Sequence, residues 1–309
     1  MRFLIIGAGA LGGYYGGMLL KGGADVAFLV RPRRAAQLAE SGLVIRRADG
    51  EFKTPVKTVR AGAVGGPYDV VLLACKAYDL DAAIGDFAPA LSPGGAVLPI
   101  LNGINHIEAL VARFGRERVL GGVGMVNAEL SPEGVVAFRL AADTHISYGE
   151  LDGQHSGRCE EIRAAFAAGG VPNAVSDRIL AEMWGKFCGY AAVATLATLT
   201  RARSGEVAAA PSGAAFVAAA FAECARVIAA EGYPPPPEIE EFVHGLYARL
   251  GSDYRPSIAA DLEAERPTEA EHTIGDLVRR ADRRGVEVPI LRAALCNLQI
   301  YDARRRARG

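Results

Sequence analysis

The first residues of the chain constrain its fold more than any other stretch. The apolar run Phe3–Ile6 predicts a buried strand, three glycines follow in the spacing G-x-G-x-x-G, and the residues from Tyr14 to Leu20 predict a helix. In such a unit the first glycine permits a tight turn, the second lets a pyrophosphate approach the backbone, and the third lets the helix pack on the strand. The phosphates bind free N–H groups at the helix N-terminus. The predicted cofactor contacts are Gly7, Ala8, Gly9, Ala10, Leu11 and Gly12.

The end of the second predicted strand bears on the choice of cofactor. The run Asp25–Val30 predicts a strand, and Arg31 follows it directly. An acidic residue here would hold the ribose 2′-hydroxyl of NAD, whereas a guanidinium binds the 2′-phosphate of NADP through charge-assisted hydrogen bonds. Arg31 therefore favours NADP(H) over NAD(H). The alternative interpretation, a solvated basic helix start, fits Arg33 and Arg34 better than Arg31.

Two further apolar runs end in polar residues. Tyr68–Cys75 and Ala96–Leu101 predict strands of a parallel sheet, and Lys76 and Asn102 follow them. Ligands bind outside the carboxyl ends of such strands, so both side chains are candidates for contact with the nicotinamide or the substrate. A strand-end lysine in water and a simple turn asparagine are the alternatives.

The pattern of the chain changes near Asp177. Before it, the stretches Leu43–Arg47 and Phe52–Val59 predict a hairpin, and Val135–Leu140 with His145–Gly149 predict an antiparallel edge. After it, apolar residues recur at helical spacing. Further helices are predicted at Ala214–Ala230, Glu238–Leu250, Ile258–Glu265 and Glu269–Arg284. The predicted fold is α/β, with an N-terminal Rossmann-type dinucleotide-binding domain (residues 1–174) followed by an all-α C-terminal domain (residues 175–309).

Three side chains in the helical half could take part in chemistry. Lys186 lies in an aromatic stretch, where partial desolvation would suit an amine to deliver a proton to a developing alkoxide. Ser257 precedes a predicted helix, and Glu269 follows Thr268 at another helix start. The alternatives are a charged helix flank for Lys186, an N-cap for Ser257, and a favourable first-turn acid for Glu269, with Thr268 and Glu271 as a capping box.

The composition of the chain argues against several classes of protein. The net charge of −1 argues against nucleic acid or an anionic membrane as the main partner. The five cysteines are scattered without a C-x-x-C pair, which is typical of reduced thiols in a cytoplasmic protein, and no metal-ligand spacing is seen. The Ala-rich stretch Val207–Ala222 holds Pro211 and Gly213 and is too short to cross a bilayer, so no membrane partner is expected.

Taken in order, these motifs resemble the ketopantoate reductase (2-dehydropantoate 2-reductase) family over nearly the whole chain. The glycine turn, Arg31, the Lys76 strand end and Leu101–Gly103 resemble the cofactor half of that family. Trp184-Gly185-Lys186 is similar to its catalytic-lysine helix. The segments Pro256–Asp261 and Arg266–Glu269 are similar to its S-x-x-x-D and R-x-T-E motifs.

The resemblance implies NADPH-dependent reduction of a 2-keto acid to a 2-hydroxy acid, with 2-dehydropantoate becoming pantoate in pantothenate biosynthesis. It implies that Lys186 donates the proton, that Glu269 supports Lys186 and the substrate hydroxyl, and that Ser257 binds the substrate carboxylate. Lys76 and Asn102 would line the nicotinamide side of the cleft, with Asn102 also reaching the substrate. A homodimer is a family-level expectation.

The chain departs from the family pattern where asparagines usually grip the substrate. Those positions hold Tyr190, Ala194, Ser204 and Tyr254. Without these hydrogen-bonding partners a site discriminates less strongly for a substrate hydroxyl, so a more hydrophobic 2-keto acid is an open alternative. Two different functions also stay open, namely a reductase of the same architecture for a 3-keto acid or an imine, and an NADP(H)-binding sensor without turnover.

Overall fold

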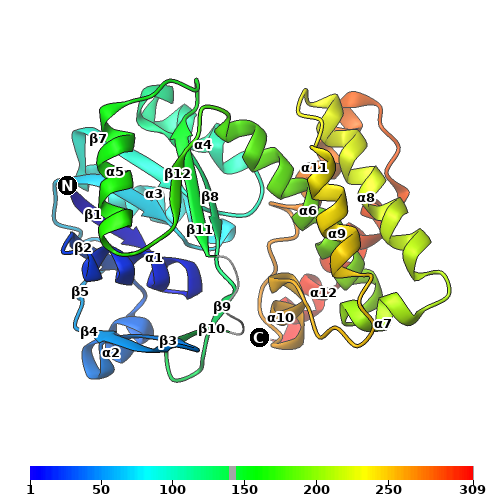
Figure 1. The fold of residues 1–309 in the computed structure, drawn as a ribbon, viewed down its shortest axis with the longest axis horizontal. Helices are drawn as coiled ribbons and strands as arrows, with labels where there is room; N and C mark the ends of the chain where they lie inside the picture. The colour runs from blue at the N-terminus through cyan, green and yellow to red at the C-terminus, as the bar shows by residue number, and fades with distance from the viewer. Residues whose placement is uncertain (139–143, 309) are drawn as a thin grey trace. The chain divides into compact units, whose positions relative to one another are not determined.

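The computed structural model describes residues 1–138 and 144–308, which form two compact units. The first unit comprises Met1–Leu101 and His106–Leu180, and the second comprises Asn102–Asn105 and the chain from Ala181 onward. The first unit contains the strands, and the second is helical (Figure 1). The predicted fold class is confirmed. The sequence did not show that the short segment Asn102–Asn105 groups with the helical unit.

A five-stranded sheet forms the centre of the first unit. Its strands, in spatial order, are β5 (Lys57–Val59), β2 (Asp25–Leu29), β1 (Arg2–Ile6), β6 (Tyr68–Leu73) and β7 (Leu91–Pro99). All neighbouring strands are parallel. The apolar sequences of β1 and β6 are almost entirely buried, as expected for parallel strands covered on both faces. The carboxyl ends of β2, β1 and β6 therefore meet at one edge, where ligands of such sheets bind.

The glycine turn joins β1 to the first helix as predicted. The helices up to residue 168 are α1 (Ala10–Lys21), α2 (Pro32–Ser41), α3 (Leu80–Phe87), α4 (Asn105–Phe114) and α5 (Gly157–Ala168), with single 3₁₀ turns η1 (Ala77–Asp79), η2 (Ala88–Ala90) and η3 (Arg116–Arg118). Gly7 has φ +92°, a backbone conformation that favours glycine. A Cβ added at Gly12 would lie closer than 3.0 Å to the carbonyl oxygen of Gly7, so only glycine lets α1 pack this closely.

Two smaller sheets correct the prediction for the remaining strands. These strands are β3 (Leu43–Arg47), β4 (Gly50–Thr54), β8 (Leu120–Met125), β9 (Ala128–Leu130), β10 (Val135–Phe138), β11 (His145–Glu150) and β12 (Asn173–Val175). β10 lies between β9 and β3, and β11 lies between β8 and β12. Each strand has an antiparallel neighbour, β9 for β10 and β8 for β11, but in the described residues the two strands lie in separate sheets and do not form one antiparallel edge as predicted. Residues 139 and 140 lie outside the described residues. An alternating pattern marks a strand's buried face but not its neighbour.

The predicted hairpin is correct only in part. β3 and β4 pair antiparallel as expected, but β5 leaves them and pairs parallel with β2 at the edge of the large sheet. Pro55 lies between β4 and β5 and has no N–H to donate to a ladder, so the predicted strand Phe52–Val59 divides there.

The second unit is built from helices that share an apolar core. They are α6 (Ile179–Thr200, which begins in the first unit), α7 (Ser204–Ala209), α8 (Gly213–Ala230), α9 (Pro237–Leu246), α10 (Ser257–Glu263), α11 (Ile274–Arg284) and α12 (Pro289–Arg308). α8 contacts α9, α11 and α12 (Figure 1). α11 begins at Ile274 rather than at the predicted Glu269, and α9 ends at Leu246 rather than at Leu250. Gly285, with φ +65°, ends α11 in the left-handed conformation.

One helix in the described residues is long and apolar enough to span a membrane by length and composition, namely α8. The stretch Val207–Ala222, judged too short from the sequence, is interrupted at Pro211 between α7 and α8, but α8 begins at Gly213 and runs for 18 residues. The core helix of a soluble protein passes the same test, so this finding is weak support for a membrane span.

Candidate active site

The glycine turn provides a cradle that fits a dinucleotide pyrophosphate. Gly9 is the N-cap of α1, and a Cβ added there would have no neighbouring atom within 4 Å. The first turn of α1 carries no acidic residue. The N–H groups at this helix end thus border open space. The helix dipole places positive partial charge there, which favours binding of an anion. The cofactor fits the predicted residues Gly7 to Gly12; their contact with it remains a prediction.

Arg31 and Arg34 occupy different environments. Arg31 follows β2 and forms an ion pair with Asp79, while its side chain stays 74% exposed. Arg34 is half-buried; its Nε donates to the Ala8 carbonyl at 2.9 Å and its Nη1 donates to the Gly134 carbonyl at 2.8 Å. Burial lowers the pKa of the Arg34 guanidinium. The expectation of a solvated helix start is therefore wrong for Arg34, which ties the glycine turn to α2.

The two strand-end candidates lie in different units. Lys76 follows β6 at the start of η1, and its carbonyl accepts from the Asp79 N–H at 2.9 Å. Asn102 follows β7 and groups with the helical unit. Both side chains are half-buried. Each residue therefore follows a strand, as the sequence predicted. Their contacts with a ligand remain predictions.

Lys186 and Glu269 form the centre of the candidate site in the helical unit. Lys186 is half-buried on α6, between buried neighbours in sequence. Burial lowers the pKa of its amine to about 8, and the negative charge of Glu269 acts in the opposite direction. Glu269 is 7% exposed, and its carbonyl accepts from the Thr273 N–H at 3.0 Å and hydroxyl at 2.8 Å. The structure therefore brings together two residues that are 83 positions apart in sequence.

His272 belongs to the same cluster, although no role for it was predicted from the sequence. Burial lowers the pKa of its imidazole, while the charges of Glu269 and Asp276 and a hydrogen bond with the Asn102 backbone act in the opposite direction. A Cβ added at Gly103, whose φ is +86°, would lie 3.0 Å from Cδ2 of His272. His272 thus joins the Asn102–Gly103 turn to the turn of Glu269. Its position three residues after Glu269 was the only signal in the sequence.

The turn that carries Glu269 is anchored to α12 rather than capped. The Thr268 hydroxyl donates to Asp302 Oδ2 at 2.6 Å, and the Tyr301 hydroxyl donates to the Arg266 carbonyl at 2.9 Å. Glu271 accepts hydrogen bonds from Arg279 and Gln299. The predicted Thr268–Glu271 capping box is therefore wrong, because both side chains are engaged by residues elsewhere.

A buried charge cluster holds the turn of α6 that precedes Lys186. Arg280 donates to Asp276 at 2.8 Å and to Glu231 at 2.7 Å, and its guanidinium carbon lies 5.0 Å from the ring centroid of Trp184. Trp184 in turn stacks on Tyr233 with 5.5 Å between ring centroids. Since a buried guanidinium must keep its partners, this cluster fixes the register of α6 near the lysine.

The remaining positions with a predicted role in substrate binding differ in burial and in their hydrogen bonds. Ser257 is the first residue of α10 and is exposed, and Pro256 rather than Ser257 is the N-cap. Ser204 donates its N–H to the Tyr254 carbonyl at 3.1 Å, and burial raises the pKa of the Tyr254 hydroxyl to about 12. Ala194 is fully buried. Two of the four residues that replace family asparagines are therefore hydrogen-bonded neighbours.

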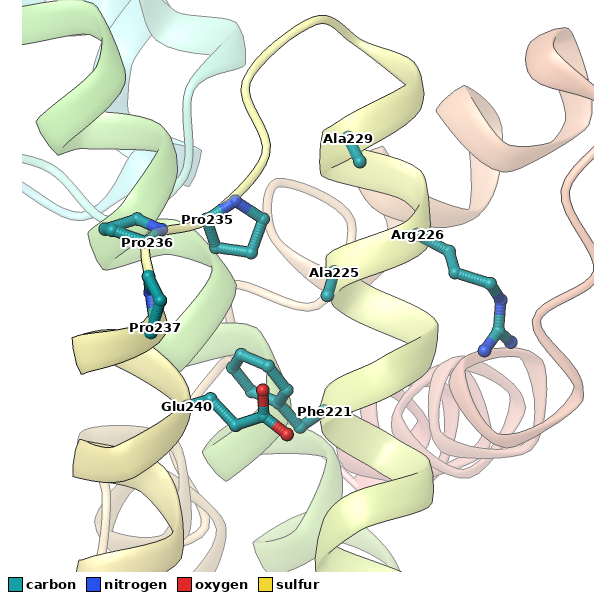
Figure 2. A pocket seen from close by; sticks show the side chains of 8 residues that line it. All are labelled: Phe221, Ala225, Arg226, Ala229, Pro235, Pro236, Pro237 and Glu240. Atoms are coloured by element: carbon teal, nitrogen blue, oxygen red, sulfur yellow. The ribbon is translucent and has the colours of Figure 1, made fainter.

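A groove of about 370 Å³ between α8, a proline-rich loop and α9 contains none of these candidate residues. Figure 2 shows Phe221 and Ala225 of α8 on one side and Pro235 to Pro237 on the other, with Glu240 at the start of α9. The groove is lined mainly by apolar side chains and has no residue in common with the Lys186 cluster.

Comparisons with known proteins place the chain in a family. Residues 3–153 match the profile described as ketopantoate reductase PanE/ApbA, and residues 178–301 match the profile of its C-terminal domain. The Bacillus subtilis protein described as uncharacterized oxidoreductase YkpB is 33% identical over 99% of this chain and 100% of its own length. The chain therefore belongs to the ketopantoate reductase family.

Solved structures agree with this assignment. A 2-dehydropantoate 2-reductase from Geobacter metallireducens is 29% identical, with 97% of this chain and 99% of that chain covered and a TM-score of 0.87. D-mandelate dehydrogenase, solved with NADH and anilino(oxo)acetate, shares the fold at 23% identity, with 99% and 100% of the chains covered and a TM-score of 0.89. The chain is an oxidoreductase of the class that acts on CH–OH groups, as predicted. The D-mandelate dehydrogenase structure holds a nicotinamide dinucleotide, NADH.

Proposed function

We propose that the protein uses NADPH to reduce a 2-keto acid to a 2-hydroxy acid, with 2-dehydropantoate as the first substrate to test. The observation that carries this proposal is the half-buried Lys186 amine, whose pKa of about 8 suits proton transfer near neutral pH. When bound, the reduced nicotinamide supplies the hydride.

Lys186 acts on the oxygen of the keto group. Negative charge grows on that oxygen during reduction, and a nearby ammonium stabilises the charge and then donates a proton to it. Glu269 keeps the amine protonated, because its negative charge raises the pKa that burial lowers. His272 and the turn at Asn102 hold the Glu269 segment in place.

The other predicted residues would bind the ligands. The N–H groups around Gly9 hold the pyrophosphate, and Arg31 holds the 2′-phosphate. Ser257, exposed at the start of α10, binds the substrate carboxylate, and Asn102 supplies an amide to the substrate. Tyr190, Ala194 and Tyr254 replace asparagines with apolar or aromatic groups, which supports a 2-keto acid with a more hydrophobic side chain as the second candidate.

The test is a substrate panel with the purified protein. NADPH oxidation would be followed with 2-dehydropantoate, with branched and aromatic 2-keto acids, with 3-keto acids and with imines. Turnover of at least one 2-keto acid is expected. Turnover of 3-keto acids or imines alone would favour a different reductase, and NADPH binding without any turnover would favour a sensor.

The pH profile should report the Lys186 amine. Because the protonated form is the acid, kcat/KM should be steady below a break near the pKa of about 8 and fall about tenfold per pH unit above it. Glu269→Gln removes the charge that raises this pKa, so the break should move to lower pH. A rise in kcat/KM through pH 8, or a break that moves upward in Glu269→Gln, would contradict the role.

Arg31→Ala should distinguish the two cofactors. The substitution removes a charged donor to the 2′-phosphate, so the KM for NADPH should rise about tenfold or more while the KM for NADH changes little. Steady-state kinetics with both cofactors measure this, and Arg33→Ala, an exposed neighbour, is the matched control. Equal effects on both cofactors would refute the assignment of Arg31.

A further inference from the structure

The ion pair between Arg31 and Asp79 lies across the strand end where the glycine turn begins. Arg31 follows β2 and Asp79 closes the η1 turn after β6, and β1 lies between β2 and β6 in the sheet. The Gly7 N–H donates to the Leu29 carbonyl of β2 at 3.0 Å, and the Ala74 N–H donates to the Ile6 carbonyl of β1 at 3.1 Å. The pair therefore borders the site at which a dinucleotide would bind.

The Asp79 side chain is less exposed than that of its partner Arg31. Its side chain is 32% exposed, against 74% for Arg31, and its backbone N–H donates to the Lys76 carbonyl. Asp79 is also the residue before α3, where an aspartate commonly caps a helix. In the described chain its carboxylate makes no such capping bond to α3 and pairs with Arg31 instead.

We propose that Asp79 is a specificity-determining residue that competes with the cofactor 2′-phosphate for Arg31, so that the protein accepts NADH as well as NADPH. This inference rests on the proposed function, which places the nucleotide at the glycine turn. A phosphate that binds Arg31 must displace the carboxylate or remain beside it, and two anions that share one guanidinium repel each other. A ribose 2′-hydroxyl can instead donate a hydrogen bond to the carboxylate, as acidic residues do in NAD sites.

The Asp79→Asn variant tests this inference, because it removes the charge and keeps the size. Calorimetric titration of NADPH and NADH without keto acid should show NADPH binding tightened about three- to tenfold and NADH binding changed by less than about threefold. The gain should shrink at high salt and in an Arg31→Ala background, where no guanidinium is left to compete for. Asp81→Asn, an exposed acid two positions along the chain, is the matched control and should change neither affinity.

Three outcomes of the Asp79→Asn titration would overturn the inference. Weaker NADPH binding in Asp79→Asn would mean that Asp79 orients Arg31 for the phosphate, and an equal change for both nucleotides would mean a structural effect; either result overturns the inference, as does an unchanged NADPH affinity. Wild-type protein that binds both nucleotides but reduces no keto acid would refute the proposed activity and leave this binding test valid.

Discussion

Replacing Lys186 with alanine should lower kcat for keto acid reduction by about 10²- to 10⁴-fold, the usual effect of losing a general acid. The Lys186 amine is half-buried, and Glu269 acts on its pKa. Without it, the charge that develops on the keto oxygen has no cation beside it and no proton to accept. The affinity for NADPH alone should change little, because the predicted pyrophosphate cradle lies at the glycine turn of the first unit.

Two controls separate chemistry from folding in this experiment. Lys57→Ala, at an exposed position of β5, should keep wild-type kcat. Lys186→Ala should also keep its melting temperature within a few degrees, because removing an amine whose pKa is lowered by burial relieves a cost of desolvation. A near-normal kcat in Lys186→Ala would remove the proton-donor role.

Alanine at Gly12 should lower the stability of the protein, whereas alanine at Gly9 should leave it unchanged. At Gly12 the added Cβ meets the Gly7 carbonyl oxygen closer than 3.0 Å and Ala74 Cβ at 3.0 Å, so α1 must move. Such overpacking costs about 3 kcal/mol and should lower the melting temperature by about 6–12 °C. At Gly9 the Cβ enters open space and φ is −79°, so Gly9→Ala should keep the wild-type melting temperature.

The same pair of variants locates the cofactor. Gly9→Ala should weaken NADPH binding by about tenfold or more, because the methyl group occupies the space left for the pyrophosphate. Thermal unfolding and nucleotide titration on both variants measure the two effects separately. Normal NADPH affinity in Gly9→Ala would place the pyrophosphate elsewhere, and an unchanged melting temperature in Gly12→Ala would refute the close-packing argument.

Features set by neighbouring residues were predictable from the sequence. The strand, glycine turn and helix at the N-terminus depend on residues a few positions apart, and the structure has them as predicted. The partners of β10 and β11 were not predictable, because strand pairing depends on residues far away in the chain. The start of α11 moved for the same reason, since Thr268 hydrogen-bonds Asp302, 34 residues later, and so cannot form the expected cap.

In the candidate site, too, contacts between residues far apart in the sequence could not be predicted. Lys186 and Glu269 could be proposed from a resemblance to known motifs, and the structure then brought them into electrostatic contact. The link from His272 to the turn at Asn102, the anchoring of Arg34 on Ala8 and the pairing of Asp79 with Arg31 join residues 26 to 170 positions apart. In the sequence, each of these polar residues looks like an ordinary surface or turn residue. Its partner can be identified only from the fold.

The most direct test of the account is NADPH oxidation by the wild-type protein with the 2-keto acid panel, compared with Lys186→Ala on the best substrate. Turnover of 2-dehydropantoate or a more hydrophobic 2-keto acid is expected, and that turnover should be lost in the variant although NADPH still binds. Absence of turnover with every 2-keto acid, or equal turnover in the variant, would contradict it.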